Sequence, residues 1–168
     1  MRATKRRAVR QDTRVHVSAK VDYAIRAAIE LAVQQENDGG LITAERLGEA
    51  QGIPRPFLAT ILQQLRRAGI VDSKRGVDGG HRLAKPAGDI ALADVIRAVD
   101  GPMAAVAGVA PEQVDYPGAS AQLREVWIAV RASLRSVLEV TTVADLASGE
   151  LPSVISELIA APGAWDRR

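Results

Sequence analysis

Residues 43–69 read TAERLGEAQGIPRPFLATILQQLRRAG, and their spacing predicts two helices joined by a tight turn. Thr43 can cap a short first helix, and Gly52 stands where a left-handed residue often ends one. Pro54 and Pro56 fit the start of the second helix, where the missing backbone N–H costs no hydrogen bond. An apolar stripe follows on that helix, formed by Leu58, Ile61, Leu62 and Leu65. A short helix, a turn with glycine and a longer helix predict a helix-turn-helix.

The outward side chains of the second helix indicate what it can bind. None of them is an acid, whereas an ordinary solvated helix face carries both signs of charge. Gln can form two hydrogen bonds with adenine and Arg can form two with guanine, so the first turns can read base edges. The arginines near its end suit either DNA phosphates or the terminal carbonyls of the helix itself. The expected contacts are Arg55, Ala59, Thr60, Gln63, Gln64, Arg66 and Arg67.

Residues 70–84, IVDSKRGVDGGHRLA, predict a β-hairpin with a glycine-rich turn. Directly after a helix-turn-helix, such a hairpin is a wing. Lys74 and Arg75 lie on its loop, where the small glycines would let an arginine enter a narrow minor groove. His81 lies on the second strand, where it either contacts DNA or covers the hairpin.

Two further helices are expected to complete a domain of residues 15–102. Ser18 can cap the first one, whose inward positions are Val21, Ala24, Ile25, Ala28, Ile29, Leu31 and Ala32, and which stops at residues 37–40, NDGG. The other has Leu92, Val95, Ile96 and Val99 facing inward and ends at residues 100–102, DGP. We therefore expect a mainly α fold, a winged helix-turn-helix domain.

A long helix is predicted from Ala121, after residues 103–120, which have no periodicity and are expected to be a loop. Its apolar residues alternate in steps of four and three, which is typical of a coiled-coil seam of about two and a half heptads. Such a seam needs a partner helix to cover Trp127, which predicts a homodimer; the alternative is that the helix packs on its own domain. The seam consists of Leu123, Trp127, Val130, Leu134, Val137 and Thr141.

Short helices are expected between the seam and residue 160, and a tail over residues 161–168. Thr142 and Asp145 resemble a capping box. Ser153 can cap a last helix that contains Val154, Ile155, Leu158 and Ile159. With the long helix they make up the expected dimerisation region, residues 121–160, and we expect them to pack across the dimer.

Composition excludes several functions. The chain has 168 residues, 47% of them hydrophobic, and no cysteine, so it can hold no disulfide, thiolate zinc site, cysteine nucleophile or cysteine-ligated iron–sulfur cluster. Its two histidines, His16 and His81, are too few for a metal site built from histidines, so no metal and no cofactor are expected. No apolar stretch is long enough to span a membrane, and no secretion signal is present, so we expect a cytoplasmic protein without a membrane partner.

Charge is divided unequally along the chain. Residues 1–86 have 16 Lys and Arg against 9 Asp and Glu, a net charge of +7, whereas residues 87–168 have 6 against 11, a net charge of −5. This asymmetry suggests that the first half faces a polyanion. Residues 1–14 alone carry +5 and are expected to be a disordered tail, either a solvated extension or an arm that contacts phosphates.

Nothing in the sequence indicates an enzyme. There is no Gly-x-Ser-x-Gly, no His-Glu-x-x-His and no phosphate loop, and neither histidine has a plausible acid–base context. No catalytic residue is expected. The better rival to a DNA-binding protein is a protein-interaction module, but the acid-free surface of residues 55–67 argues against it.

The sequence itself resembles a known family. The segments are SAKVDYAIRAAIELA, ITAERLGEAQGIPRPFLATILQQLRRAGIVDSKRGVDGGHRLAKP and IALADVIRAVDGP. They are similar to the Rrf2 family of bacterial winged helix-turn-helix transcription regulators from about Val15 to Pro102, and more weakly through Trp127. The resemblance implies a homodimer with a long dimerisation helix that binds a palindromic promoter site on double-stranded DNA. It implies base-reading positions at Arg55, Phe57, Ala59 and Thr60, and a minor-groove arginine at Arg75.

The loop of residues 103–120 departs from the family pattern. Cluster-binding members place three cysteines there, whereas this loop reads MAAVAGVAPEQVDYPGAS and offers only Glu112 and Asp115, hard oxygen donors unsuited to an iron–sulfur cluster. Asp22 matches a carboxylate ligand of some relatives, but without a thiolate we expect it to be an exposed residue in the first helix turn. We expect a cluster-free regulator, a repressor, that responds either to a small molecule in a pocket at this loop or to a protein partner.

Overall fold

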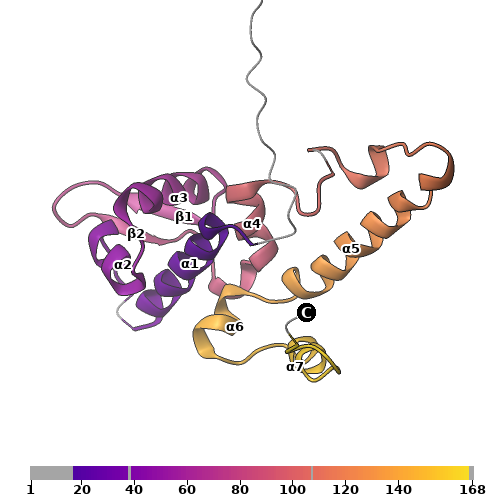
Figure 1. Cartoon of the computed structure of the whole chain (residues 1–168). Coiled ribbons are helices and arrows are strands. Elements are labelled where there is room, and N and C mark those ends of the chain that lie inside the picture. The colour runs from indigo at the N-terminus through magenta and orange to yellow at the C-terminus, as the bar shows by residue number, and fades with distance from the viewer. Residues whose placement is uncertain (1–16, 38, 107, 167–168) are drawn as a thin grey trace, which may run out of the picture.

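The computed structural model describes residues 17–37, 39–106 and 108–166 (Figure 1). The expected tail of residues 1–14 lies outside these ranges, as do Val15, His16 and the last two residues of the expected C-terminal tail. Within them, no helix is both long and apolar enough to cross a membrane.

Residues 17–100 form the expected winged helix-turn-helix fold. Thr43 accepts a hydrogen bond from the amide of Arg46 at 3.3 Å, and Gly52 ends the first of the two motif helices with a φ of 61°. The hydroxyl of Ser18 likewise accepts from the amide of Val21, so both predicted caps are confirmed. The elements are α1 (Ala19–Asn37), α2 (Ala44–Gln51), α3 (Arg55–Arg67), β1 (Val71–Lys74), β2 (Gly80–Leu83), the 3-10 helix η1 (Ala87–Asp89) and α4 (Leu92–Asp100).

The core lies between α1 and the helices α2, α3 and α4, and α6 (Val143–Ser148) also packs on α1 of its own chain, with Val143 buried in the core. The predicted stripe of α3 is buried throughout, with each side chain no more than 4% exposed. On α1, Ile25 and Ile29 are only half-buried and Ala27 is buried instead, because α3 and α4 cover a face slightly turned from the predicted one. Other large buried side chains include Leu31, Leu47, Ile70, Ile90 and Val95.

The wing is an antiparallel pair in which Val71 faces Leu83 and Lys74 faces Gly80. Glycine is required at positions 79 and 80 because other backbone segments pass too close for a side chain. A Cβ on Gly79 would lie 2.4 Å from the carbonyl oxygen of Lys74, and one on Gly80 would lie 2.7 Å from that of Ile42. Ile42 also exchanges two backbone hydrogen bonds with His81, which attaches the wing to the segment before α2.

Helix α5 (Leu123–Leu138) extends away from the winged domain (Figure 1). It has no fully buried residue; Trp127, Val130, Leu134 and Val137 are half-buried and Leu123 is 38% exposed. The seam stops short of Thr141, which was expected to belong to it. Thr141 lies beyond the helix and is 3% exposed, and its carbonyl accepts from the amide of Leu92 at 2.9 Å, because it packs at the edge of the core.

Residues 103–120 are less featureless than expected. They contain the 3-10 helices η2 (Pro111–Gln113) and η3 (Gly118–Ser120) and a bridge between Val106 and Val109. Ala104 has a φ of 54°, which a residue other than glycine adopts only with strain.

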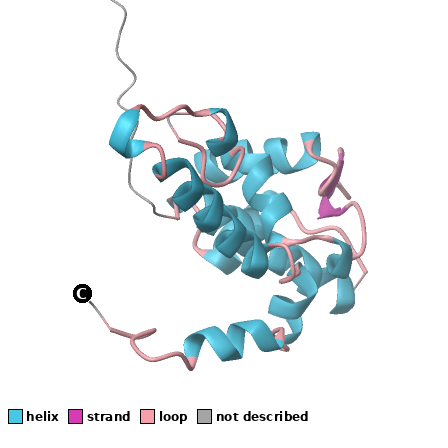
Figure 2. Cartoon of the chain, turned by 90° about the vertical axis from the view of Figure 1, so that its right-hand side faces the viewer, coloured by secondary structure: helices cyan, strands magenta, loops and turns pink. Residues whose placement is uncertain are grey.

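Two short helices end the described chain, α6 (Val143–Ser148) and α7 (Ser153–Ile159). The capping box of Thr142 and Asp145 is confirmed. The cap expected at Ser153 is wrong: Pro152 occupies the capping position and Ser153 is the first helical residue, without a side-chain capping bond. Figure 2 shows α7 standing apart from the other helices, and it leaves Leu158 and Ile159 exposed.

Candidate nucleic-acid interface

The outer face of α3 carries most of the residues expected to read DNA. Its stripe of buried leucines and Ile61 fixes which side chains point outward. Gln64 differs from expectation, since it is half-buried and its Oε1 is buried without a hydrogen-bond partner. The exposed residues are Arg55, Phe57, Ala59, Thr60, Gln63, Arg66 and Arg67.

Arg55 begins α3 and forms an ion pair with Glu45 of α2. Both side chains are largely exposed, at 73% and 60%. An exposed pair of this kind is worth at most about 1 kcal/mol, so a DNA phosphate or base can displace the carboxylate at little cost. The helix face itself has no acid, but an acid of the preceding helix reaches its first residue.

Phe57 is 55% exposed, and one side of its ring contacts α1. Its ring meets the ring of Tyr23 edge-on, with centroids 6.1 Å apart, and the guanidinium of Arg26 lies 5.6 Å from the centre of Tyr23. Arg26 also donates to the backbone carbonyl of Gln51 at the end of α2. Sequence reasoning missed Tyr23 and Arg26, although their spacing of three residues puts them on one face of α1. They position the start of α3.

Thr60 uses its hydroxyl hydrogen within the helix, since Oγ1 donates to the carbonyl of Pro56 at 3.2 Å. Its oxygen therefore reaches solvent as an acceptor, beside its methyl group. This pairing suits a base amino group together with a thymine methyl.

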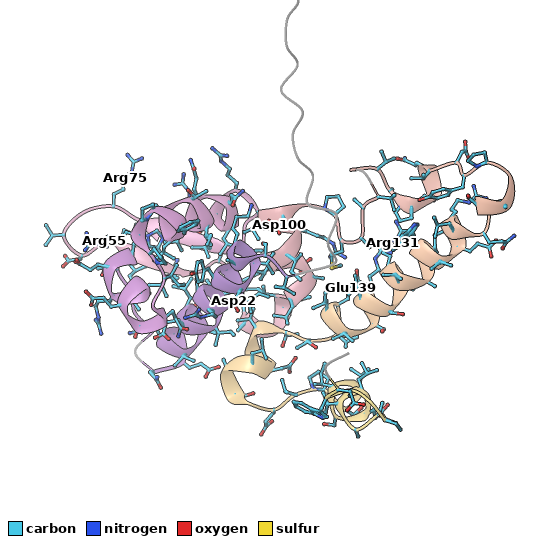
Figure 3. The ribbon with its side chains drawn as sticks, in the orientation of Figure 1. Asp22, Arg55, Arg75, Asp100, Arg131 and Glu139 are labelled. Carbon is cyan, nitrogen blue, oxygen red and sulfur yellow. The ribbon has the colours of Figure 1, made fainter. Side chains whose placement is uncertain are left out.

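The wing presents two cations without ion pairs. Lys74 was expected on the loop but is the last residue of β1, paired with Gly80, and Arg75 follows it on the loop. Both are exposed, and neither has an ion pair within the described ranges. Figure 3 shows Arg75 projecting away from the ribbon at the wing, on the same side of the molecule as α3. Asp72 on β1 lies 4.0 Å from Arg82 on β2, across the hairpin. The carboxylate of Asp72 therefore pairs with Arg82 and not with Lys74 or Arg75.

His81 packs within the wing and is half-buried. Burial lowers the pKa of His81 below its ordinary value of 6.5, and the positive charge of Arg66 at the end of α3 lowers it further. Its Nδ1 is buried without a partner. Of the two roles expected for His81, these surroundings favour covering the hairpin.

Asp22 lies where expected, exposed in the first turn of α1, and it pairs with Arg26 at 3.2 Å. Figure 3 shows it on the winged domain, far from the loop that precedes α5. The structure does not bring Asp22 together with Glu112 or Asp115.

A helix pair with a winged hairpin and an outward cationic face defines this chain as a winged helix-turn-helix DNA-binding protein. The comparisons with known proteins narrow the class. A family model described as Rrf2, iron-dependent transcriptional regulator, matches residues 17–149. The chain belongs to the Rrf2 family, whose members are transcription regulators and not enzymes.

Relatives and solved structures agree with this assignment. A Mycobacterium tuberculosis protein named as an HTH-type transcriptional regulator is 44% identical over 144 residues, which cover 86% of this chain and 88% of that protein. IscR of Cereibacter sphaeroides is 30% identical, over 80% of this chain and 88% of its own. The structure of CymR of Bacillus subtilis, the global cysteine regulator, matches with a TM-score of 0.67 and 31% identity, over 81% of this chain and 98% of that one.

The residues present do not fit an iron–sulfur cluster. The chain has no cysteine, and the two acids of the loop before α5 are engaged with cations. Glu112 pairs with Arg131 at 2.6 Å, and Asp115 lies 3.9 Å from Arg124. The backbone hydrogen bond to Glu112 and the contact with Arg131 lower the pKa of that carboxyl. Among the described residues no three His, Asp or Glu side chains gather as metal ligands would.

Proposed function

We propose that this protein is a sequence-specific repressor that binds a palindromic promoter site as a homodimer in the bacterial cytoplasm. The observation that carries the proposal is the cationic surface formed by the end of α3 and the wing. Arg66, Arg67, Lys74 and Arg75 are all exposed, and none has an ion pair within the described part of the chain. Four unpaired cations on adjacent elements attract a phosphate backbone.

The two elements have different tasks in this proposal. Helix α3 enters the major groove, where Arg55, Thr60 and Gln63 meet base edges, and Phe57 and Ala59 make apolar contacts. Arg66 contacts phosphates, and Gln64 contacts them only if its half-buried side chain turns outward. Lys74 contacts the backbone beside the wing, and Arg75 enters the minor groove.

The dimer rests on α5. Its half-buried row of Trp127, Val130, Leu134 and Val137, with Leu123 at the end, is covered only in part by the chain itself. We infer that a second copy covers this row, so that residues 121–160 form the dimerisation region and residues 15–102 the DNA-binding domain. Two such domains on a twofold axis would read half-sites about 34 Å apart, one helical turn of DNA.

Footprinting on fragments recovered by genome-wide mapping of bound DNA tests this proposal. We expect protection of an inverted repeat and two subunits per site by sedimentation of the complex. Loss of the protein should raise transcription from those promoters. A bound monomer on an asymmetric site would overturn the dimer, and reduced transcription on its loss would overturn the repressor.

Loop 103–120 is the proposed point at which a signal enters. A small molecule is the better candidate because a pocket lies beside this loop. The alternative is a protein partner that docks on the loop or on α5. A screen of small metabolites against promoter affinity separates them, since a ligand shifts DNA binding only if its affinity differs between two states.

A further inference from the structure

A pocket of about 380 Å³ lies where α4, the loop after it and α5 meet. All the charged side chains that line it are arginines: Arg97 from α4, and Arg131 and Arg135 from α5. The remaining lining is small and apolar and includes Met103, Ala105 and Pro111. Figure 3 shows Arg131 between α5 and the loop that runs beside it.

Arg131 and Arg135 have donors to spare. They are four residues apart, so they lie on one face of α5. Arg131 pairs with Glu112 through Nη1, and Arg135 pairs with Glu139 through Nε at 3.5 Å. Each guanidinium has five N–H donors, more than these contacts with single carboxylates use. A guanidinium with two adjacent free N–H groups can hold an oxyanion by two parallel hydrogen bonds.

The carboxylates that pair with these arginines hold them in place without lining the pocket. Glu112 fixes Arg131, whose side chain is only 18% exposed. Asp94 fixes Arg97 at 3.2 Å, and Glu139 contacts both Arg97 and Arg135. Three arginines are therefore oriented toward one cavity. Because Asp94, Glu112 and Glu139 balance their charge, an anion would be held there by their remaining N–H donors and not by a net positive charge.

We propose that this pocket binds a small organic anion, with a carboxylate or phosphate head on Arg131 and Arg135 and an apolar body against Met103 and Pro111. The volume lies within the range of ordinary ligand pockets. The cationic lining disfavours a cation, and the apolar remainder disfavours a fully hydrated inorganic ion.

Binding here would reach the DNA-binding domain through α4. This helix supplies Arg97 to the pocket and packs against α1 and α3 on its other side. Glu139 bridges α4 and α5 through Arg97 and Arg135, and an anion held by Arg131 and Arg135 would compete with it for Arg135. The angle between the two helices, and with it the spacing of the two DNA-reading domains, would change. This regulatory step, unlike the binding site itself, rests on the proposed function.

Isothermal titration of the full chain at low ionic strength tests the site. The probes are acetate, hexanoate, inorganic phosphate and hexyl phosphate, which compare a carboxylate head with a phosphate head, each with and without an apolar body. We expect hexanoate or hexyl phosphate to bind with a Kd below about 1 mM and at least tenfold more tightly than its bare head, and Arg131→Gln and Arg135→Gln each to weaken binding by about tenfold. Arg124→Gln, on the same helix outside the lining, should change it less than about twofold.

Three outcomes would overturn the site. They are no binding of any probe, an unchanged affinity in the Arg135→Gln variant, and equal weakening by Arg124→Gln, which would indicate diffuse attraction to α5. Circular dichroism and binding to the mapped promoter fragment accompany each variant. A chain that binds DNA but no probe refutes the pocket alone, whereas a chain that binds a probe but no duplex refutes the proposed function alone.

Discussion

Two arginines of the proposed interface differ in what surrounds them. Arg75 projects from the wing loop with no ion pair within the described residues, whereas Arg55 is already paired with Glu45. A guanidinium without an ion pair loses only its hydration when it enters a groove, whereas Arg55 must also lose its contact with Glu45. We therefore assign more binding free energy to Arg75 than to Arg55.

Arg75→Ala should cost about 1–3 kcal/mol of specific binding and relax the preference at one base position per half-site. Fluorescence anisotropy with the mapped operator and its single-base variants measures both. Val77→Ala, in the same turn and fully exposed, is the matched control and should leave affinity unchanged. Unaltered specific affinity in the Arg75 variant would mean that the wing does not read DNA.

His81 should make the fold less stable in mild acid. Burial first, and Arg66 second, lower its pKa in the folded chain below 6.5. As the pH falls through 6.5 the unfolded chain takes up the proton first, so the free energy of unfolding decreases and continues to do so down to the pKa of the folded state. Urea unfolding between pH 7.5 and about 5.5 measures this, above the range where carboxylates titrate. His81→Gln should flatten the curve, and an equal slope in that variant would refute the assignment.

At the scale of single elements, the winged hairpin depends on the close packing of its turn. Gly79→Ala would push a Cβ against the Lys74 carbonyl, so we expect the free energy of unfolding to fall by about 1–3 kcal/mol. Gly88→Ala is the control, since nothing lies within 4 Å of the added atom and that glycine does not need a positive φ. Thermal unfolding compares the two. Equal stability of both variants would show that the turn adjusts freely.

Helix α5 carries the dimer prediction. Trp127→Ala should weaken the dimer by about 2 kcal/mol or more, roughly 30-fold in its dissociation constant, because a central aromatic anchor would be removed. Val126→Ala, next to it and 51% exposed but outside the seam, should have little effect. Sedimentation over a range of concentrations measures both. An unchanged distribution in the Trp127 variant would reject the assigned interface.

Elements with strong local signals were predicted well, and positions that depend on packing were not. The caps at Ser18 and Thr43 and the stripe of α3 follow from local hydrogen bonds and from helical spacing. Thr141 fits the heptad pattern, yet tertiary packing against α4 draws it into the core. Gln64 is half-buried with its Oε1 out of contact with solvent, which helical spacing alone does not reveal. The arginine pocket joins residues more than thirty positions apart, so no local pattern could indicate it.

At the scale of the whole chain, the excess positive charge lies before the winged fold: residues 1–14 carry +5, whereas residues 17–100 have 11 Lys and Arg against 11 Asp and Glu. The winged domain carries the unpaired cations, while α5 and its loop hold their arginines in ion pairs. This division would direct DNA toward the wing and away from α5. It leaves α5 available for a partner subunit.

Removal of residues 1–14, which carry +5, should weaken binding to all DNA sequences alike and flatten its dependence on salt. The slope of log affinity against log salt is measured for the intact and the truncated protein. The difference between the two slopes gives the number of phosphates that the segment neutralises. Arg75→Ala serves as the comparison, because we expect it to weaken binding more on the operator than on random DNA. A truncation effect confined to the operator would mean that the segment reads bases.

The pair of Arg55 and Glu45 bears on how the free protein avoids wrong sites. On meeting a duplex, Arg55 would exchange a carboxylate for a phosphate or a guanine, so the gain is only the difference between two similar contacts. Adhesion to arbitrary DNA is therefore strengthened little by this side chain. A guanine that accepts two hydrogen bonds would displace the carboxylate more readily than a lone phosphate oxygen would, so Glu45 would disfavour attachment to arbitrary DNA slightly, by no more than the roughly 1 kcal/mol that the exposed pair is worth.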